Sequence, residues 1–95
     1  MNHHNLKCHP NHFNPILDGG KTFEIRKNDR DYKTGDSFTL HEYYYDHGHY
    51  YTGRKISGVV GHVSDYCQWP GYIVFSLLKL GLLIIDTEEN KNEPV

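Results

Sequence analysis

The sequence has few cysteines, and we expect no secretory leader. It contains two cysteines, Cys8 and Cys67, too few for the disulfide framework that stabilises many small secreted domains. Its first ten residues, MNHHNLKCHP, lack the basic and apolar regions of a signal peptide. We therefore expect a reduced, cytoplasmic setting with free cysteines, although a disulfide or redox pair between the two is the alternative.

The sequence also lacks an apolar run long enough to cross a bilayer. The most apolar stretch, YIVFSLLKLGLLII at residues 72–85, is interrupted by Lys79 and Gly81 and falls short of the ~20 residues that a transmembrane helix needs. This stretch is typical of buried core, and we expect no membrane partner.

The chain has no excess of positive charge. Its formal net charge is −2, which argues against nonspecific coating of duplex DNA, because that depends on many Lys and Arg side chains. Residues 86–95, however, hold four acids and one Lys, so residues 1–85 carry nine bases and eight acids, a net of +1. We expect residues 1–85 to form a single domain that can hold a basic cleft, and residues 86–95 to be an acidic, disordered tail.

Composition and periodicity favour an α+β fold. Eight of the 13 aromatic residues are Tyr, which suits half-buried sheet surfaces. One short helix is predicted within PNHFNPILDGG, weakened by Pro15. Strands are predicted at residues 5–8, 22–27, 37–45, 54–63 and 72–80, and LLII offers a sixth. This pattern indicates a small, partly open, mixed β-barrel of five to six strands with one or two short helices.

Charge is concentrated in GGKTFEIRKNDRDYKTGD, residues 19–36. The period of two in a strand places Glu24 and Arg26 on one face, and Lys21 enters just after two glycines. Together they could read a nucleobase and its phosphate. The simpler alternative is a solvated face with an ordinary ion pair worth ~0–1 kcal/mol.

The segment LDGGKTFEIR resembles the signature of the ASCH domains, Gly-x-Lys-x-x-Glu-x-Arg, with Gly19, Lys21, Glu24 and Arg26 in its fixed positions. The longer run from Leu6 to Tyr43 is similar to a branch of small bacterial and phage proteins that share FEIRKNDRxxxxGD. This resemblance, over residues 3 to about 80, implies a PUA-like barrel and a cleft, lined by the motif's Lys, Glu and Arg, that is thought to bind RNA.

We therefore expect RNA or a nucleotide-like small molecule as the partner. Arg26 and Lys21 would hold a phosphate or a carbonyl edge, and Glu24 would accept from a base amine. Aromatic side chains such as Tyr43, Tyr45, Tyr66 and Trp69 could stack on bases. The candidate binding residues are Lys7, Lys21, Glu24, Arg26, Lys27, Arg30, Tyr43 and Trp69.

Two further functions stay open. Some small ASCH proteins that resemble this chain are amidohydrolases of acetylcytidine, with a catalytic Lys, a Thr three residues later and a distant Glu. Lys21 matches the Lys, but Glu24 occupies the Thr position, and an adjacent carboxylate favours the ammonium form, which is not nucleophilic. The third possibility is a phage or mobile-element module that binds another protein through its tyrosines.

Histidines are abundant near the N-terminus. The segment HHNLKCHPNH places His3, His4, Cys8, His9 and His12 within ten residues, but structural zinc sites combine two ligand pairs. Only half of such an arrangement is present. We predict no metal and no cofactor.

Overall fold

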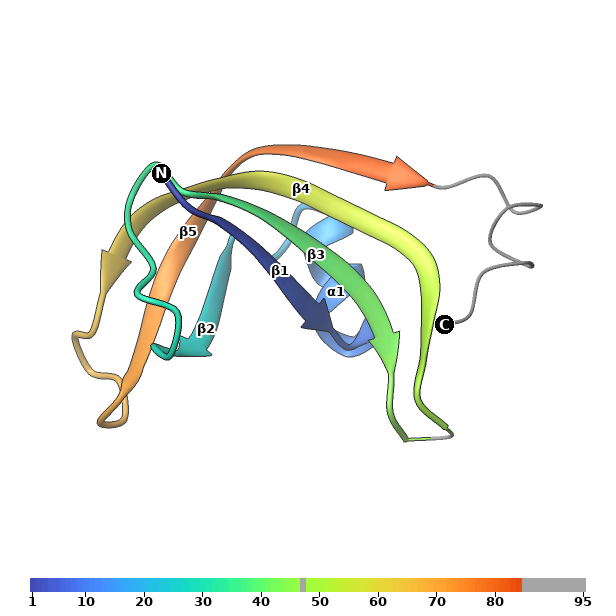
Figure 1. The fold of residues 1–95 in the computed structure, drawn as a ribbon, viewed down its shortest axis with the longest axis horizontal. Coiled ribbons are helices and arrows are strands. Elements are labelled where there is room, and N and C mark those ends of the chain that lie inside the picture. The colour runs from blue at the N-terminus through green and yellow to red at the C-terminus, as the bar shows by residue number, and fades with distance from the viewer. Residues whose placement is uncertain (47, 85–95) are drawn as a thin grey trace.

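Five strands form one sheet that curls into a half-barrel over a short helix (Figure 1). The computed structural model describes residues 1–46 and 48–84. The elements are β1 (His3–Cys8), α1 (Pro10–Leu17), β2 (Phe23–Lys27), β3 (Ser37–Tyr44), β4 (Tyr50–Ser64) and β5 (Tyr72–Ile84). The strand order is β1-β3-β4-β5-β2, with β1 parallel to β3 and the other pairs antiparallel. This arrangement confirms a small mixed α+β barrel in its coarse form, although the barrel is open.

The helix α1 begins and ends where the sequence predicts. Pro10 occupies its first turn, where a missing N–H costs little, and the His9 side chain caps it by accepting a hydrogen bond from Asn11 N at 3.1 Å. Pro15 lies inside the helix. Because proline weakens helices, the eight residues depend on packing, and Phe13 is fully buried beneath the sheet.

A single core joins α1 to the concave face of the sheet. The largest fully buried side chains are Phe13, Phe38, Phe75, Leu6, Ile16, Leu40 and Val60. They come from α1 and from every strand except β2. The edge strand β2 therefore contributes little to the apolar core.

The inward face of β2 is its charged face. The predicted alternation is correct in period, but Phe23 and Ile25 are 42% and 51% exposed, whereas Glu24 is only 4% exposed. Glu24 lies opposite the core residue Phe75 in the ladder with β5, so both residues project to the concave side. The alternative of a solvated Glu24 face is wrong, because the sheet curls toward that side.

The C-terminal strand decides between the five and six strands that the sequence predicts. The LLII segment does not begin a sixth strand, because β5 runs from Tyr72 to Ile84. Lys79 has a positive φ of 52°, and the ladder with β4 shifts register nearby, between Ser57 and Val59. A bulge of this kind lets one strand bend and continue. The described residues therefore contain five strands and one helix, and the predicted tail at 86–95 lies outside them.

The break between β3 and β4 is shorter than the sequence predicts. We predicted a tip from residue 46 to residue 53, but β4 already begins at Tyr50. Cross-strand aromatic pairs extend the ladder: Tyr43 faces Tyr51 and Tyr44 faces Tyr50.

Candidate functional site

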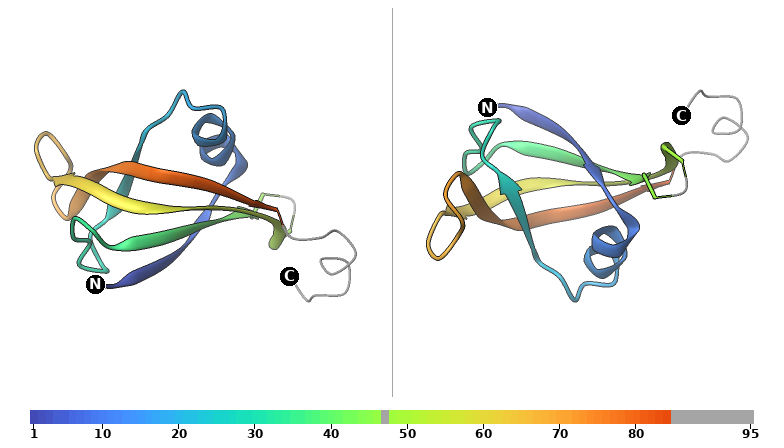
Figure 2. Two further views of the ribbon diagram at one scale, coloured as in Figure 1. Left: turned by 90° about the horizontal axis from the view of Figure 1, so that it is seen from above. Right: turned by 90° about the horizontal axis from the view of Figure 1, so that it is seen from below.

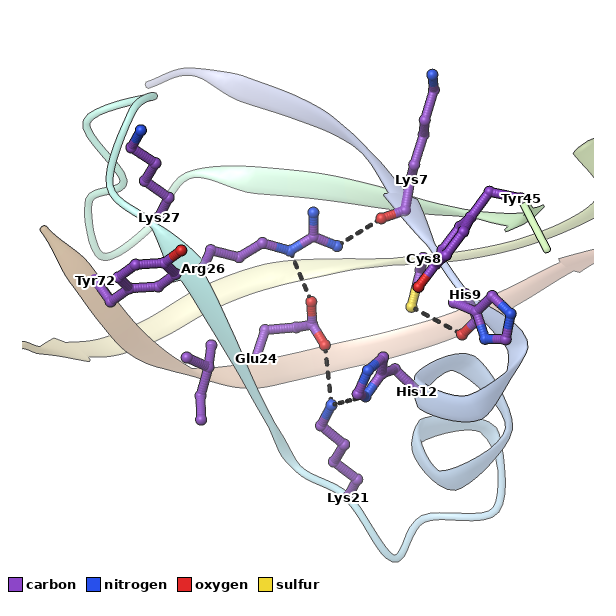
Figure 3. A pocket seen from close by; sticks show the side chains of 11 residues that line it. Lys7, Cys8, His9, His12, Lys21, Glu24, Arg26, Lys27, Tyr45 and Tyr72 are labelled. Atoms are coloured by element: carbon purple, nitrogen blue, oxygen red, sulfur yellow. Dashed lines mark hydrogen bonds and ion pairs between the residues drawn. The ribbon is translucent and has the colours of Figure 1, made fainter. Parts of the chain in front are cut away.

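A cleft of about 450 Å³ opens between the two edge strands and the start of α1 (Figure 3). Seen from below, β1 and β2 flank the open side of the sheet (Figure 2). The cleft is lined by Lys7, Cys8, His9, His12, Lys21, Glu24, Ile25, Arg26, Lys27, Tyr45 and Tyr72. It lies within the size range of small-molecule sites.

Glu24 stands at the centre of this cleft and holds two cations. Its Oε2 accepts from Arg26 Nε at 2.9 Å, and its Oε1 accepts from Lys21 Nζ at 3.3 Å. The Glu24 side chain is almost fully buried, and the two cationic side chains are partly exposed. Buried carboxylates need such partners, since an unpaired charge in a protein interior is costly. The pairing therefore fixes the floor of the cleft while leaving the cations within reach of solvent.

Arginine side chains bridge the seam where the half-barrel does not close. Arg26 Nη2 donates to the carbonyl oxygen of Lys7 at 2.7 Å, and Arg30 Nη1 donates to that of Asn5 at 3.2 Å. Both carbonyls belong to β1, which pairs with β3 alone. The arginines therefore satisfy backbone acceptors that a sixth strand would satisfy in a closed barrel.

Histidines form the wall of the cleft nearest α1. Lys21 Nζ donates to His12 Nδ1 at 3.3 Å, so this ammonium contacts both an imidazole and Glu24. His9 Nε2 lies 3.2 Å from Asp46 Oδ1, and the His9 ring is 4.8 Å from that of Tyr45. Among residues 1–46 and 48–84, no group of three or more His, Cys, Asp or Glu is arranged to hold a metal ion.

The cleft is strongly cationic relative to the chain. Lys21, Arg26 and Lys27 line it against the single carboxylate of Glu24, which gives three positive charges and one negative charge, a local net of +2 with neutral histidines. Lys7 also lines the cleft, but its ammonium packs on Tyr43, outside it (Figure 3). The whole chain has a formal net charge of −2. The cleft therefore attracts anions, although the protein as a whole does not.

The cysteine in the cleft is chemically quiet. Burial, together with the smaller effect of the Glu24 charge, raises the pKa of the Cys8 thiol to about 12. Cys67 is exposed in the loop before β5, and both cysteines are free. The alternative of a Cys8–Cys67 disulfide is therefore wrong for this structure.

Five of the predicted binding residues line the cleft, and three do not. Lys7, Lys21, Glu24, Arg26 and Lys27 meet there. Arg30 lies along the seam beyond the cleft. Tyr43 packs under the Lys7 ammonium, 4.5 Å from ring centroid to Nζ, and Trp69 is 81% exposed in the β4–β5 loop. Neither aromatic residue lines the cleft.

Of the other cleft residues, sequence reasoning gave only Tyr45 a ligand role, as a possible stacking surface for a base. His9 and His12 attracted attention only as possible metal ligands. Tyr72 enters the cleft because it pairs with Lys27 across the β2–β5 ladder. Only that long-range strand pairing could have identified it.

A second buried carboxylate serves the structure. Glu42 accepts from Arg54 Nε at 2.8 Å, from Arg54 Nη2 at 2.6 Å and from Thr52 Oγ1 at 2.5 Å. Burial by itself would raise the pKa of Glu42, but the hydrogen bonds from Arg54 and Thr52 outweigh it, and the pKa is lowered. Arg54 also donates to Asn14 of α1 at 2.8 Å and lies over the Phe13 ring. This cluster fastens α1 to the β3–β4 hairpin.

Comparison with known proteins places the chain in a family. Residues 3–77 match DUF3850, described as a domain of unknown function. The chain belongs to this family. It is also similar to an "Uncharacterized 12.9 kDa protein in GpA 3'region" of Escherichia phage P2, with 38% identity over 66 residues. That match covers 70% of this chain and 58% of the phage protein, so the chain spans less than two thirds of its relative's length.

The family match includes the residues that build the site. The five cationic and acidic residues that line the cleft, from Lys7 to Lys27, all lie within residues 3–77. None of the helices in the described part of the chain is long and apolar enough to cross a membrane.

Proposed function

We propose that this protein binds RNA or a nucleotide-like ligand in the cleft between β1 and β2. The observation that carries the proposal is a local charge of +2, from Lys21, Arg26 and Lys27 around the buried Glu24 carboxylate, in a chain of formal net charge −2. Such a cleft provides donors for phosphate at its rim and an acceptor for a base amine at its floor. Electrostatic attraction alone would allow any anion to bind. The Glu24 carboxylate, as a hydrogen-bond acceptor, favours a ligand that also carries hydrogen-bond donors.

Arg26 is placed to contact the ligand and the protein at once. Its Nε and Nη2 atoms bind Glu24 and the Lys7 carbonyl. In the described residues, no hydrogen bond uses its Nη1, which points away from Glu24 in Figure 3. A guanidinium held on two sides presents its remaining donors with little loss of side-chain entropy.

The same features support membership of the ASCH superfamily and a PUA-like fold. The half-barrel, its single helix and a cleft lined by Lys21, Glu24 and Arg26 are the parts that the resemblance implies. Phosphate recognition would occur in the cytoplasm, where free thiols such as Cys67 persist.

A titration followed by heteronuclear NMR tests the proposal. We expect a pool of short RNAs and nucleoside monophosphates to shift the amides of Lys21, Glu24 and Arg26, with affinity that falls as salt rises. Lys27→Ala removes a rim cation and should weaken binding about three- to tenfold. Lys33→Ala is the matched control, because Lys33 pairs with Asp31 on the exposed β2–β3 loop. If the cleft amides do not shift in a folded spectrum, the proposal is wrong.

The contact between Lys21 and His12 supports a second candidate, an amidohydrolase that acts on an acetylated nucleoside. The His12 imidazole lies 3.3 Å from Lys21 Nζ, within reach of the nitrogen that would act as nucleophile or base in such a reaction. Acetate release from acetylcytidine that disappears in Lys21→Met and in His12→Phe would support this activity. Release that is unchanged in both variants, or absent from the wild type, would exclude it.

A further inference from the structure

Exposed tyrosines stand at the two ends of the cationic cleft. Figure 3 shows Tyr72 at one end and Tyr45 at the other, with Arg26 and Glu24 between them. The two tyrosines are 40% and 58% exposed. Large aromatic surfaces left open to water at both ends of a charged cleft are candidate contacts for flat ligand groups.

Tyr45 differs from the other tyrosines of its hairpin. The Tyr43–Tyr51 and Tyr44–Tyr50 pairs lie across the β3–β4 ladder with ring centroids 4.8 and 5.0 Å apart, so they stabilise the hairpin. Tyr45 follows the last pair of the ladder and packs against His9, at the N-cap of α1, with its ring tilted by 58°. This contact supports the ring beside the cleft and leaves more than half of the residue exposed.

Tyr72 has a similar position at the other end. It begins β5 directly after the Trp69–Tyr72 turn, whose hydrogen bond from Tyr72 N to Trp69 O is 2.9 Å long. Its partner in the ladder is Lys27, a rim cation. An aromatic residue and a cationic residue therefore lie opposite each other in the ladder at this end of the cleft.

We propose that the ligand is single-stranded RNA of at least two nucleotides, with one base on Tyr72, the next on Tyr45, and the linking phosphate at the cations between them. This inference rests on the proposed function of the same cleft. Base stacking on aromatic rings needs unpaired bases, and it tolerates any sequence because every base has a π-face. A duplex hides those faces, and a mononucleotide can use only one ring.

Isothermal titration with chains of increasing length tests this arrangement. The probes are adenosine and uridine 5′-monophosphates, the corresponding di- and tetranucleotides, and a double-stranded RNA long enough to stay annealed during the titration. We expect the wild type to bind dinucleotides at least tenfold more tightly than mononucleotides, and duplexes more weakly than single strands. In Tyr45→Ala and Tyr72→Ala, the ratio of dinucleotide to mononucleotide affinity should fall toward one.

Matched variants separate stacking from general damage. Tyr45→Phe and Tyr72→Phe keep the ring and should keep the ratio, whereas Tyr66→Ala removes an 80% exposed tyrosine outside the cleft and should change nothing. An unchanged ratio in both alanine variants overturns this inference. If mononucleotides bind in a way that depends on Lys27, and longer chains bind no more tightly, the two-base arrangement is wrong but the proposed function stands. Absence of binding by every probe overturns both.

Discussion

Arg26 of β2 donates a hydrogen bond to the backbone carbonyl of Lys7 in β1, across the open side of the half-barrel, at 2.7 Å. The same guanidinium binds the buried Glu24. One side chain therefore bridges the two edge strands and forms part of the candidate ligand site. Binding and stability are linked at this residue, so the effects of its substitution must be separated.

Replacing Arg26 should weaken the fold as well as the site. We expect Arg26→Ala to lower the free energy of unfolding by about 1–3 kcal/mol, because Glu24 loses a partner and the Lys7 carbonyl loses its donor. Arg30→Ala removes a longer bond made by a half-exposed side chain and should cost less than about 0.5 kcal/mol. Urea denaturation measures both. Equal stability of Arg26→Ala and the wild type would contradict the bridging role.

Acid should remove the contribution of the Glu42–Arg54 pair. The pKa of Glu42 in the folded state is lowered from its ordinary value of 4.5. The ionised Glu42 therefore contributes fully to the free energy of unfolding above pH 4.5, and this contribution is lost as the pH falls toward the folded-state pKa. The stability difference between wild type and Glu42→Gln should therefore shrink from about pH 6 to about pH 3. Urea denaturation across this range measures it. Asp31→Asn, at an exposed pair, is the control; a constant difference for Glu42→Gln would exclude the effect.

A side chain at Gly58 should disrupt the sheet. A Cβ atom there would lie 2.5 Å from Phe38 Cζ and 2.8 Å from the Leu78 carbonyl oxygen, both too close. We expect Gly58→Ala to destabilise the protein by about 1–3 kcal/mol. At Gly81 the nearest contact of a Cβ atom would be Ser57 Oγ at 3.4 Å, so Gly81→Ala should be nearly neutral. Thermal unfolding of the two variants makes the comparison, and equal melting temperatures would contradict this packing.

The two cysteines should react at very different rates. Cys67 is exposed, whereas Cys8 is buried with its pKa raised to about 12, so almost no thiolate exists at neutral pH. Iodoacetamide should add one group to the native protein, on Cys67, and a second only in urea. Mass spectrometry of Cys67→Ser should show no native adduct. Rapid native labelling of that variant would mean that Cys8 is accessible.

Local sequence patterns predicted most of the elements but left the facing of one strand, β2, undecided. Short-range periodicity gives the strands and α1, because hydrogen bonding imposes those periods wherever the elements pack. It cannot show which side of an edge strand faces inward. In β2 the alternation alone leaves both faces possible, and the buried side is decided by the pairing with β5 and by the Glu24 ion pairs.

The candidate site was predictable only where its residues are close together in the sequence. The charged residues from Lys21 to Lys27 are close in sequence, so their spacing shows that they can meet. Tyr72 lies 45 positions after Lys27 in the numbering, and only the ladder brings them together. Tyr43 and Trp69 were chosen as aromatic residues, but stacking depends on which ring is left uncovered beside the cleft.

The order of the strands also affects how the protein can fold during synthesis. β1 pairs with β3, and β2 pairs only with β5. Residues 23–27 therefore leave the ribosome long before their partner, residues 72–76, has been made, and they must wait in an unpaired state. A nascent chain that stops before β5 would have every cation of the cleft, yet it would have no strand on which to assemble them.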